Sequence, residues 1–317
     1  MAITHPVGGL ALGTGRFCMD ALDVELDVLD AWRDAGGRLI DTASVYGRGE
    51  SEQAIGTWLR SRGTRDEVVL LTKGAHPDEG DWSSRVTPEI IHSDLTGSLE
   101  RLGVPAVDIY LVHRDRPAVP VGEILDALAA EVAAGRARSF GVSNWTIGRL
   151  DEGNAYAAAR GWPPIAWSSP SLALARPAGE PWPGTVDAGD DASRAWYASN
   201  QTRMAVWSPT ANGYFAADAD LADPLFDAYR TPANETRRAR AAAFGAARGL
   251  TASQVALAWV VNQPVRPVAV IGTRSVAHLR EAMAAAAVSL SGADIAWLER
   301  GGATTDTPRQ RQAATWS

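Results

Sequence analysis

The strongest constraint on the fold is the repeated alternation of short apolar segments with longer helical segments along the chain. The apolar segments are rich in Val, Ile and Leu, which is typical of strands buried on both faces of a parallel sheet. One of the helical segments opens with Thr87 and Pro88, a capping residue followed by a proline in the first turn. The expected strands cover residues 10–13, 38–42, 68–73, 107–113, 138–142, 164–167, 204–207 and 268–271.

Eight such strands separated by helices favour a closed α/β barrel, the (β/α)8 TIM barrel, over an open sheet. A length of 317 residues suits one domain of this kind, and no linker or internal repeat divides it, so residues 1–317 are expected to form a single domain. The segment 172–192 is rich in Pro, Gly and Asp and is too long for a simple connection. It is therefore expected to be a long active-site loop at the C-terminal face.

Composition excludes several classes of partner. The net charge of −7 argues against nucleic acid and against an anionic membrane, since both need a basic face. The single cysteine, Cys18, permits no internal disulfide, and no Cys/His cluster indicates a metal site. The chain has no apolar run of spanning length and no signal-peptide pattern near its start, so a cytoplasmic protein with a small-molecule substrate is expected.

Four chemically different side chains follow the expected strands at their carboxyl ends. Asp41 and Tyr46 follow the second strand, Lys73 ends the third, and His113 ends the fourth. Taken singly, each has an ordinary structural explanation, such as a helix cap, a core tyrosine or a packed histidine. Active sites of parallel barrels lie at this end of the strands, so together the four residues predict a catalytic site there.

Lys73 is the only lysine among the 30 basic residues of the chain. A lysine is a compact ammonium whose pKa shifts on burial, whereas an arginine keeps a rigid, permanently charged fork. We expect Asp41 to hold Lys73 charged, and Lys73 to lower the pKa of Tyr46 from its usual value near 10. Tyr46 would then donate a proton to a carbonyl oxygen that His113 orients, while a cofactor supplies hydride.

These residues resemble the motifs of the aldo-keto reductase superfamily, in the same order along almost the whole chain. The resemblance is carried by residues 41–47 with 50–52, by Thr72 and Lys73, by His113, and by residues 141–144. It implies that Asp41, Tyr46, Lys73 and His113 form a catalytic tetrad with Tyr46 as the general acid in reduction and the base in oxidation. It also implies an NAD(P)(H)-dependent oxidoreductase that interconverts an aldehyde, ketone or sugar carbonyl and its alcohol.

The resemblance further implies a set of cofactor contacts. Ser143 and Asn144 would bind the nicotinamide carboxamide, and Trp207 would stack on the ring where the family usually has a tyrosine. The loop after Trp207 would wrap the pyrophosphate, and Arg274 with Ser275 would hold a ribose 2′-phosphate, favouring NADP(H). The full set is Ser143, Asn144, Ser168, Trp207, Ser208, Thr210, Gly213, Gly272, Thr273, Arg274, Ser275 and Glu281.

Two positions depart from the family pattern. Ser168, followed by Ser169, stands where the family usually has a glutamine that contacts the carboxamide, and Ala282 stands where an asparagine often meets the adenine. At the first position, either the serine reaches the carboxamide through a water molecule or the contact is lost. The expected consequence of the two departures is a lower cofactor affinity or tolerance of NAD(H).

The substrate pocket is expected to take its walls from loops that follow the strands. Indole and other aromatic rings at a polar rim suit a sugar face or an aromatic ring. Acidic residues in the 179–193 loop favour a neutral polyol or sugar, whereas Arg114 and Arg116 suit a carboxylate or phosphate, or else pair with Asp115. The expected wall residues are Phe17, Trp82, Trp145, Trp182 and Tyr214.

Two alternative functions use the same barrel. A Schiff-base aldolase would use Lys73 as its nucleophile, because one lysine at a strand end serves that reaction equally well. A non-catalytic cofactor-binding subunit occurs in the superfamily among ion-channel accessory proteins. The complete set of four tetrad residues argues against the second alternative.

Overall fold

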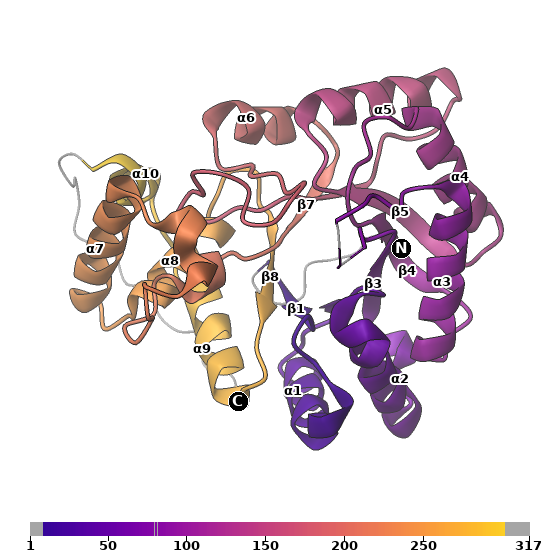
Figure 1. Ribbon diagram of the computed structural model, residues 1–317. Coiled ribbons are helices and arrows are strands. Elements are labelled where there is room, and N and C mark those ends of the chain that lie inside the picture. Colours follow the sequence, from indigo (N-terminus) through magenta and orange to yellow (C-terminus); the bar gives the residue numbers. More distant parts are fainter. Residues whose placement is uncertain (1–8, 79, 81, 302–317) are drawn as a thin grey trace.

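The structure, a computed structural model, describes residues 9–78, 80 and 82–301. Eight parallel strands close into a barrel in which each strand pairs with the next and β1 pairs with β8. Figure 1 shows β1 and β8 side by side, where the barrel closes. The strands are β1 (Leu10–Gly13), β2 (Leu39–Asp41), β3 (Val69–Gly74), β4 (Val107–Val112), β5 (Ala137–Ser143), β6 (Trp167–Ser169), β7 (Arg203–Val206) and β8 (Val268–Gly272). The predicted (β/α)8 fold is confirmed.

Helices surround the barrel, and most neighbours in space are neighbours in the chain, except that α10 packs against α7. In Figure 1, α7, α8 and α10 lie together on one side of the barrel, and α3 and α4 lie on the other. The helices are α1 (Leu22–Asp34), α2 (Glu50–Arg62), α3 (Pro88–Leu102), α4 (Val121–Ala133), α5 (Ile147–Ala159), α6 (Asp191–Ser199), α7 (Pro232–Ala246), α8 (Ala252–Val261), α9 (Val276–Ala286) and α10 (Gly292–Arg300). The predicted start of α3 is confirmed, because the Thr87 side chain accepts a hydrogen bond from the Ile90 amide.

One predicted strand was wrongly placed. The sixth strand runs Trp167–Ser169 rather than 164–167, because Pro164 has no N–H for the ladder and the Ile165 amide bonds to the Asn154 side chain instead. Helix α7 begins at Pro232, where the Thr231 side chain caps its first turn.

Alternation along the strands determines which residues line the barrel interior. One apolar cluster is built from strand residues that face inward, including Leu39, Leu71 and Leu111. Because strand side chains alternate between the two faces, residues two positions further along face the same way. For these three residues, those positions are Asp41, Lys73 and His113, which therefore lie above the apolar interior at the carboxyl end of the barrel.

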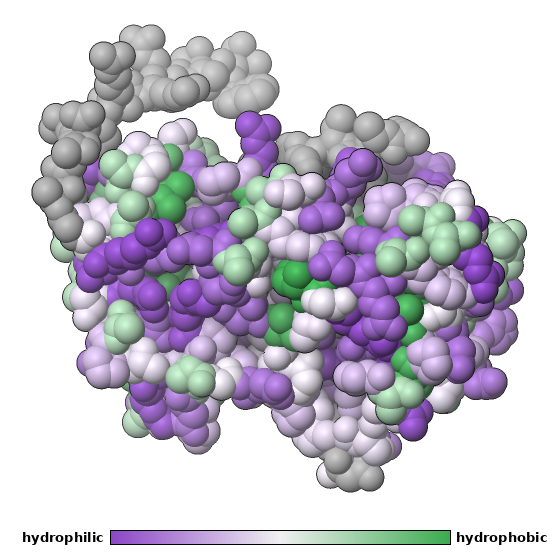
Figure 2. Space-filling view, turned by 90° about the horizontal axis from the view of Figure 1, so that it is seen from above, coloured by the Kyte–Doolittle hydropathy of each residue, from purple (hydrophilic) through white to green (hydrophobic). Residues whose placement is uncertain are grey.

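The described surface is mostly polar. Figure 2 shows a largely hydrophilic face on which hydrophobic residues form small, separate groups. Among the large hydrophobic side chains of the described residues, Val24 and Trp82 are exposed. None of the helices in the described part of the chain is long and apolar enough to cross a membrane.

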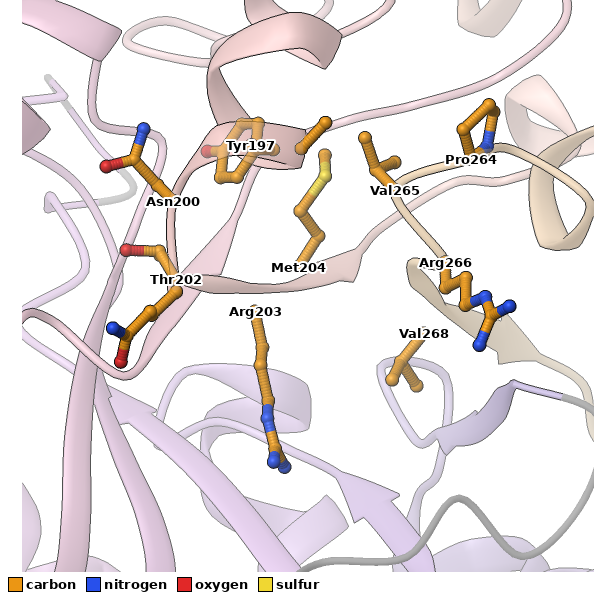
Figure 3. A pocket seen from close by; sticks show the side chains of 11 residues that line it. Tyr197, Asn200, Thr202, Arg203, Met204, Pro264, Val265, Arg266 and Val268 are labelled. Carbon is orange, nitrogen blue, oxygen red and sulfur yellow. The ribbon is translucent and has the colours of Figure 1, made fainter.

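A pocket of about 310 Å³ lies at the opposite end of the barrel from the predicted site. Its walls include Arg203 and Val268, which are the first residues of β7 and β8, and Tyr197 from α6 (Figure 3). Active sites of such barrels lie at the carboxyl ends of the strands. This pocket therefore belongs to the end that the fold uses for stability rather than for chemistry.

Candidate active site

The turn after β2 places Tyr46 at the mouth of the barrel. Gly47, Arg48 and Gly49 all have left-handed backbone conformations, with φ of 56°, 54° and 95°. A Cβ atom on Gly47 would lie 3.1 Å from the carbonyl oxygen of Phe17. Glycine avoids both the strain and the crowding, so the chain can turn directly from the Tyr46 segment into α2.

Lys73 joins the acidic and phenolic members of the predicted tetrad. Its Nζ atom donates to Asp41 Oδ1 at 2.8 Å, to the Thr42 carbonyl oxygen at 3.0 Å and to the Tyr46 hydroxyl at 3.2 Å. The lysine residue is 3% exposed. An ammonium has three N–H donors, and all three are used.

Electrostatics keep Lys73 protonated. Burial alone would lower the pKa of the ammonium, but Asp41 and Tyr46 more than offset it, and the pKa of Lys73 is raised above its usual value. Burial raises the pKa of the Asp41 carboxyl, and the adjacent Lys73 partly offsets that rise. The two side chains therefore form a buried ion pair.

The expected effect on Tyr46 was wrong in its net direction. Burial raises the pKa of the Tyr46 hydroxyl by more than the charge of Lys73 lowers it, so the pKa lies above its usual value of 10. The phenol therefore carries its proton at neutral pH. Lys73 acts on the phenolate that remains when this proton leaves.

His113 is neutral and lies beside Tyr46. The ring centroids of Tyr46 and His113 are 5.7 Å apart in an edge-to-face arrangement, and the His76 ring lies 4.7 Å from that of His113. Burial, followed by the charges of Lys73 and Arg114, holds the pKa of His113 well below its usual range. A neutral imidazole keeps one N–H, which it can donate to an oxygen atom above the barrel.

The ends of β5, β6 and β7 meet through predicted cofactor residues. The Ser143 hydroxyl donates to the Ser169 carbonyl oxygen at 2.9 Å, and Asn144 Nδ2 donates to the Ser143 hydroxyl at 2.9 Å. Trp207 Nε1 donates to Asn144 Oδ1 at 3.2 Å. The structure thus brings Ser143, Asn144 and Trp207 together at one side of the barrel mouth.

The side chain of Ser168 does not face the barrel mouth. Its hydroxyl lies 2.8 Å from the Tyr197 hydroxyl of α6, in the layer between barrel and helices. Trp167 belongs to the interior cluster, so alternation places Ser169 inward. Ser169 Oγ is buried and has no hydrogen-bond partner among the described residues. The serine that faces the site is therefore Ser169, the neighbour of the predicted Ser168.

The loop after β7 holds an unusual backbone conformation. Ser208, Ala211 and Asn212 have positive φ values of 50°, 51° and 58°, and Gly213 has a φ of 95°. Such conformations cost about 1–3 kcal/mol each in non-glycine residues and cluster at ligand sites. Asn212 Nδ2 is buried without a partner among the described residues, and Thr210 makes no side-chain cap in this turn.

The turn from β8 leads into the capped N-terminus of α9. Gly272 is exposed, and the Thr273 hydroxyl accepts from the Ser275 amide at 3.0 Å. Ser275 caps α9 by accepting from the His278 amide. Glu281 lies exposed further along α9.

Arg274 already has a partner. Its Nε atom lies 2.7 Å from Oε1 of Glu25, a residue of α1 whose side chain is fully buried. Burial raises the pKa of the Glu25 carboxyl, and Arg274 partly offsets this rise. Any anion that binds Arg274 must share it with Glu25.

Comparison with known proteins identifies the family. Residues 7–300 match the family model of the aldo/keto reductase family. The chain belongs to the aldo-keto reductase family. The predicted family is confirmed, and with it the predicted class of chemistry, the reduction of carbonyl groups.

Relatives of this aldo-keto reductase cover most of the chain. Aldo-keto reductase str7 of Strobilurus tenacellus is 27% identical over 322 residues, covering 97% of this chain and 90% of that protein. Aldo-keto reductase yakc [NADP(+)] of Schizosaccharomyces pombe is 27% identical over 286 residues, covering 84% and 79%. A crystal structure of an aldo-keto reductase from Klebsiella pneumoniae in complex with NADPH superposes with a TM-score of 0.69 at 25% identity, covering 96% and 95% of the two chains.

The aromatic residues predicted to form the substrate pocket divide into two groups. The Trp182 and Trp207 rings lie 5.7 Å apart, and the Trp82 ring lies 5.8 Å from that of His76. The three tryptophan residues are at least partly exposed, whereas His76 is buried. Trp82 packs beside His76, whose ring contacts that of His113, and Trp182 packs beside Trp207, which bonds to Asn144.

The other three predicted wall residues are packed inside the protein. Phe17 and Trp145 are 1% exposed, and Tyr214 is 0% exposed. Trp145 lies under the Arg149 guanidinium, and Tyr214 packs against the rings of Phe215, Phe226 and Tyr229. They therefore have no surface with which to contact a substrate in this conformation.

The acidic residues of the 179–193 loop hold the loop itself. Glu180 accepts from the Gly184 amide at 2.7 Å, and Asp187 accepts from the Ser171 hydroxyl at 3.0 Å. Asp190 caps α6, and Asp191 pairs with Arg194. Because each carboxylate has a structural partner, their charge no longer favours a neutral sugar.

Proposed function

We propose that this aldo-keto reductase reduces an aldehyde, ketone or sugar carbonyl to its alcohol with NADPH, using Tyr46 as the proton donor. The observation that carries the proposal is the set of three hydrogen bonds that the Lys73 ammonium donates. Two of them go to Asp41 and to the Tyr46 hydroxyl, and so connect these groups in a buried network. Few structural needs would place a phenol and an ion pair together at the mouth of a barrel.

The residues at the barrel mouth fit a nicotinamide cofactor. Ser169 Oγ and Asn212 Nδ2 are buried polar atoms without a partner among the described residues, so they are free to bond to a polar ligand. Ser143, Asn144 and Ser169 would hold the carboxamide, Trp207 the ring, residues 208–213 the pyrophosphate, and the N-terminus of α9 with Arg274 the 2′-phosphate. Ser208, Thr210, Gly213, Gly272, Thr273, Ser275 and Glu281 keep the cofactor roles that the resemblance implies.

The relatives support NADP(H) as the cofactor, since one carries NADP(+) in its name and another was crystallised with NADPH. When bound, NADPH supplies a hydride to the carbonyl carbon. The pairing of Arg274 with Glu25 weakens the hold on a 2′-phosphate. Use of NAD(H) therefore stays part of the proposal.

The proton chemistry follows from the geometry of the tetrad. The substrate oxygen sits between the Tyr46 hydroxyl and the N–H of His113, and it gains negative charge as the carbonyl carbon accepts hydride. Tyr46 then transfers its proton to that oxygen, which leaves an alcohol and a phenolate. Lys73 stabilises the phenolate, and Asp41 keeps Lys73 charged. In the direction of oxidation, the phenolate takes the proton back.

The aldolase alternative has no support from the geometry. A Schiff base requires a neutral lysine amine with a free lone pair. The Lys73 ammonium uses all three of its N–H donors, and its pKa is raised rather than lowered. The tetrad geometry likewise favours catalysis over a purely cofactor-binding role.

We also propose that the enzyme works in the cytoplasm on a small molecule. The chain has one cysteine, Cys18, so it gains nothing from an oxidising compartment. Its net charge of −7 gives it no general affinity for nucleic acid or anionic membranes.

Isotope transfer tests the reaction. NADPH carrying deuterium at the transferable position is incubated with the enzyme and a panel of aldehydes, ketones and sugars. The proposal expects NADPH oxidation and an alcohol that carries one deuterium on the former carbonyl carbon. A covalent adduct on Lys73 after borohydride treatment, without NADPH oxidation for any compound, would support the aldolase instead.

A further inference from the structure

Arg114 is a buried arginine directly after His113, at the carboxyl end of β4. The residue is 7% exposed. Its Nη1 atom donates to the His113 carbonyl oxygen at 2.9 Å, and its Nε atom donates to the Pro183 carbonyl oxygen at 3.3 Å. A guanidinium has five N–H donors. Three donors, including both on Nη2, thus make no bond to the described residues.

The acidic neighbours of Arg114 are engaged elsewhere. Asp115 pairs with Arg149 at 3.3 Å, so it is not the partner that the sequence allowed for Arg114. The Glu180 carboxylate is exposed and bonds to the Gly184 amide. No carboxylate of the described residues lies within ion-pair distance of Arg114. A buried guanidinium without an ion pair is costly, and such groups gather at functional sites.

The charge of Arg114 reaches the reacting groups. It contributes to lowering the pKa of His113, and it acts in the same direction on the pKa of Tyr46. The geometry agrees, because Arg114 Nη1 bonds to the main-chain carbonyl oxygen of His113, and the His113 ring lies 5.7 Å from the Tyr46 ring. The guanidinium is therefore held beside the residues that would contact the substrate carbonyl.

We propose that Arg114 binds an anionic group of the substrate, and that the enzyme prefers small carbonyl compounds carrying a carboxylate or a phosphate. This inference rests on the proposed function, because it names the substrate class of the same site. The planar fork of a guanidinium matches two oxygens of such a group. The loop that contains Pro183 also carries Trp182, so one segment both holds Arg114 in place and brings Trp182 beside Trp207.

Matched substrate pairs test the proposal. The ratio of kcat/KM is measured with NADPH for 4-carboxybenzaldehyde against 4-methylbenzaldehyde, and for glyceraldehyde 3-phosphate against glyceraldehyde. The wild type should prefer the anionic member of at least one pair by about tenfold or more, as expected for charge-assisted hydrogen bonds. The pair with the larger preference identifies the anion. Equal kcat/KM within both pairs would overturn the proposal.

Substitutions separate recognition from loop support. Arg114→Met keeps an extended apolar side chain, and it should lower the anionic-to-neutral ratio by about tenfold. Arg114→Lys should keep part of the preference through its charge. Arg116→Met, which removes an arginine two residues away, is the matched control and should leave the ratio unchanged. If Arg114→Met lowered kcat/KM equally for both members of each pair, Arg114 would only support the loop, and the proposal would be overturned.

A variant on the loop surface tests the same idea without altering the buried site. Glu180→Gln removes the carboxylate whose charge acts on the pKa of Arg114, so the preference for the anionic aldehyde should increase severalfold. A decrease would contradict the proposal. If none of the carbonyl compounds tested supported NADPH oxidation, the proposed function would fail, but the anion site could still be tested. Tryptophan fluorescence would then measure the binding of 4-carboxybenzaldehyde to the wild type and to Arg114→Met. About tenfold weaker binding to the variant supports the anion site, and equal binding refutes it.

Discussion

Replacing Lys73 by methionine should damage both stability and catalysis, by amounts that the structure allows to be estimated. Lys73→Met keeps the length of the side chain but removes the partner of Asp41, a buried carboxylate whose other oxygen already lacks a partner among the described residues. Breaking a buried ion pair from one side costs about 3–5 kcal/mol. With about 2.1 cal/mol/K of unfolding entropy per residue over 317 residues, this cost corresponds to roughly 4–8 °C in Tm.

The double variant Lys73→Met with Asp41→Asn is the control for this prediction. It contains no unpaired buried charge, so it should regain most of the lost Tm while regaining none of the activity. Thermal melting by circular dichroism measures stability, and NADPH oxidation with a reducible aldehyde measures turnover. Activity should fall by about 10²-fold or more in both variants, since positioned acid catalysis contributes 10²–10⁴-fold. An unchanged Tm in Lys73→Met, or restored turnover in the double variant, would refute the buried relay.

Three further predictions concern the cofactor site and pH. Glu25→Gln should tighten NADPH binding by about tenfold and NADH binding much less, because the substitution frees Arg274 from a charged partner. Tryptophan fluorescence titration measures both affinities, and an equal change for the two cofactors would contradict the prediction. Ser169→Ala should weaken NADPH binding in the same titration, while Ser168→Ala should not. The reverse result would mean that the Ser168 side chain, and not that of Ser169, faces the cofactor. The depressed pKa of His113 means that, at mildly acidic pH, the unfolded chain binds a proton that the native protein does not. The free energy of unfolding should therefore decline below about pH 6.5, the ordinary pKa of histidine. His113→Gln should lessen that decline, as measured by urea unfolding, and an identical pH dependence in the variant would disprove the prediction.

The sequence was sufficient to predict the barrel and the gathering of the tetrad. Strand periodicity and the rule that barrel sites lie at strand carboxyl ends place Asp41, Lys73 and His113 on one face without any long-range information. The position of the Tyr46 hydroxyl near these residues then follows from the short glycine-containing turn after β2. These features depend on local patterns, which a sequence records directly.

The remaining errors concern features that local patterns do not determine. Choosing between Ser168 and Ser169 requires the end of β6 to within one residue, and Pro164 displaced that strand. The pairing of Glu25 with Arg274 joins residues from opposite ends of the chain. Aromatic residues in loops look alike in sequence, whether they are packed like Tyr214 or partly exposed like Trp182.

The net pKa of Tyr46 could not be predicted for a different reason. It depends on a competition between burial, which raises the pKa, and the charge of Lys73, which lowers it. Composition and spacing give the sign of each contribution but not which is larger. The structure shows that burial prevails, so the phenol begins the reaction protonated.

The most direct test of the account is the turnover of Tyr46→Phe. The substitution removes one hydroxyl and should lower kcat for carbonyl reduction by about 10²–10⁴-fold, with NADPH affinity unchanged by fluorescence titration. Tyr156→Phe, which removes a hydroxyl on α5 that bonds to Asp126, is the matched control and should retain wild-type turnover. A Tyr46→Phe enzyme that reduces its substrate at the wild-type rate would contradict the assignment of Tyr46 as the proton donor.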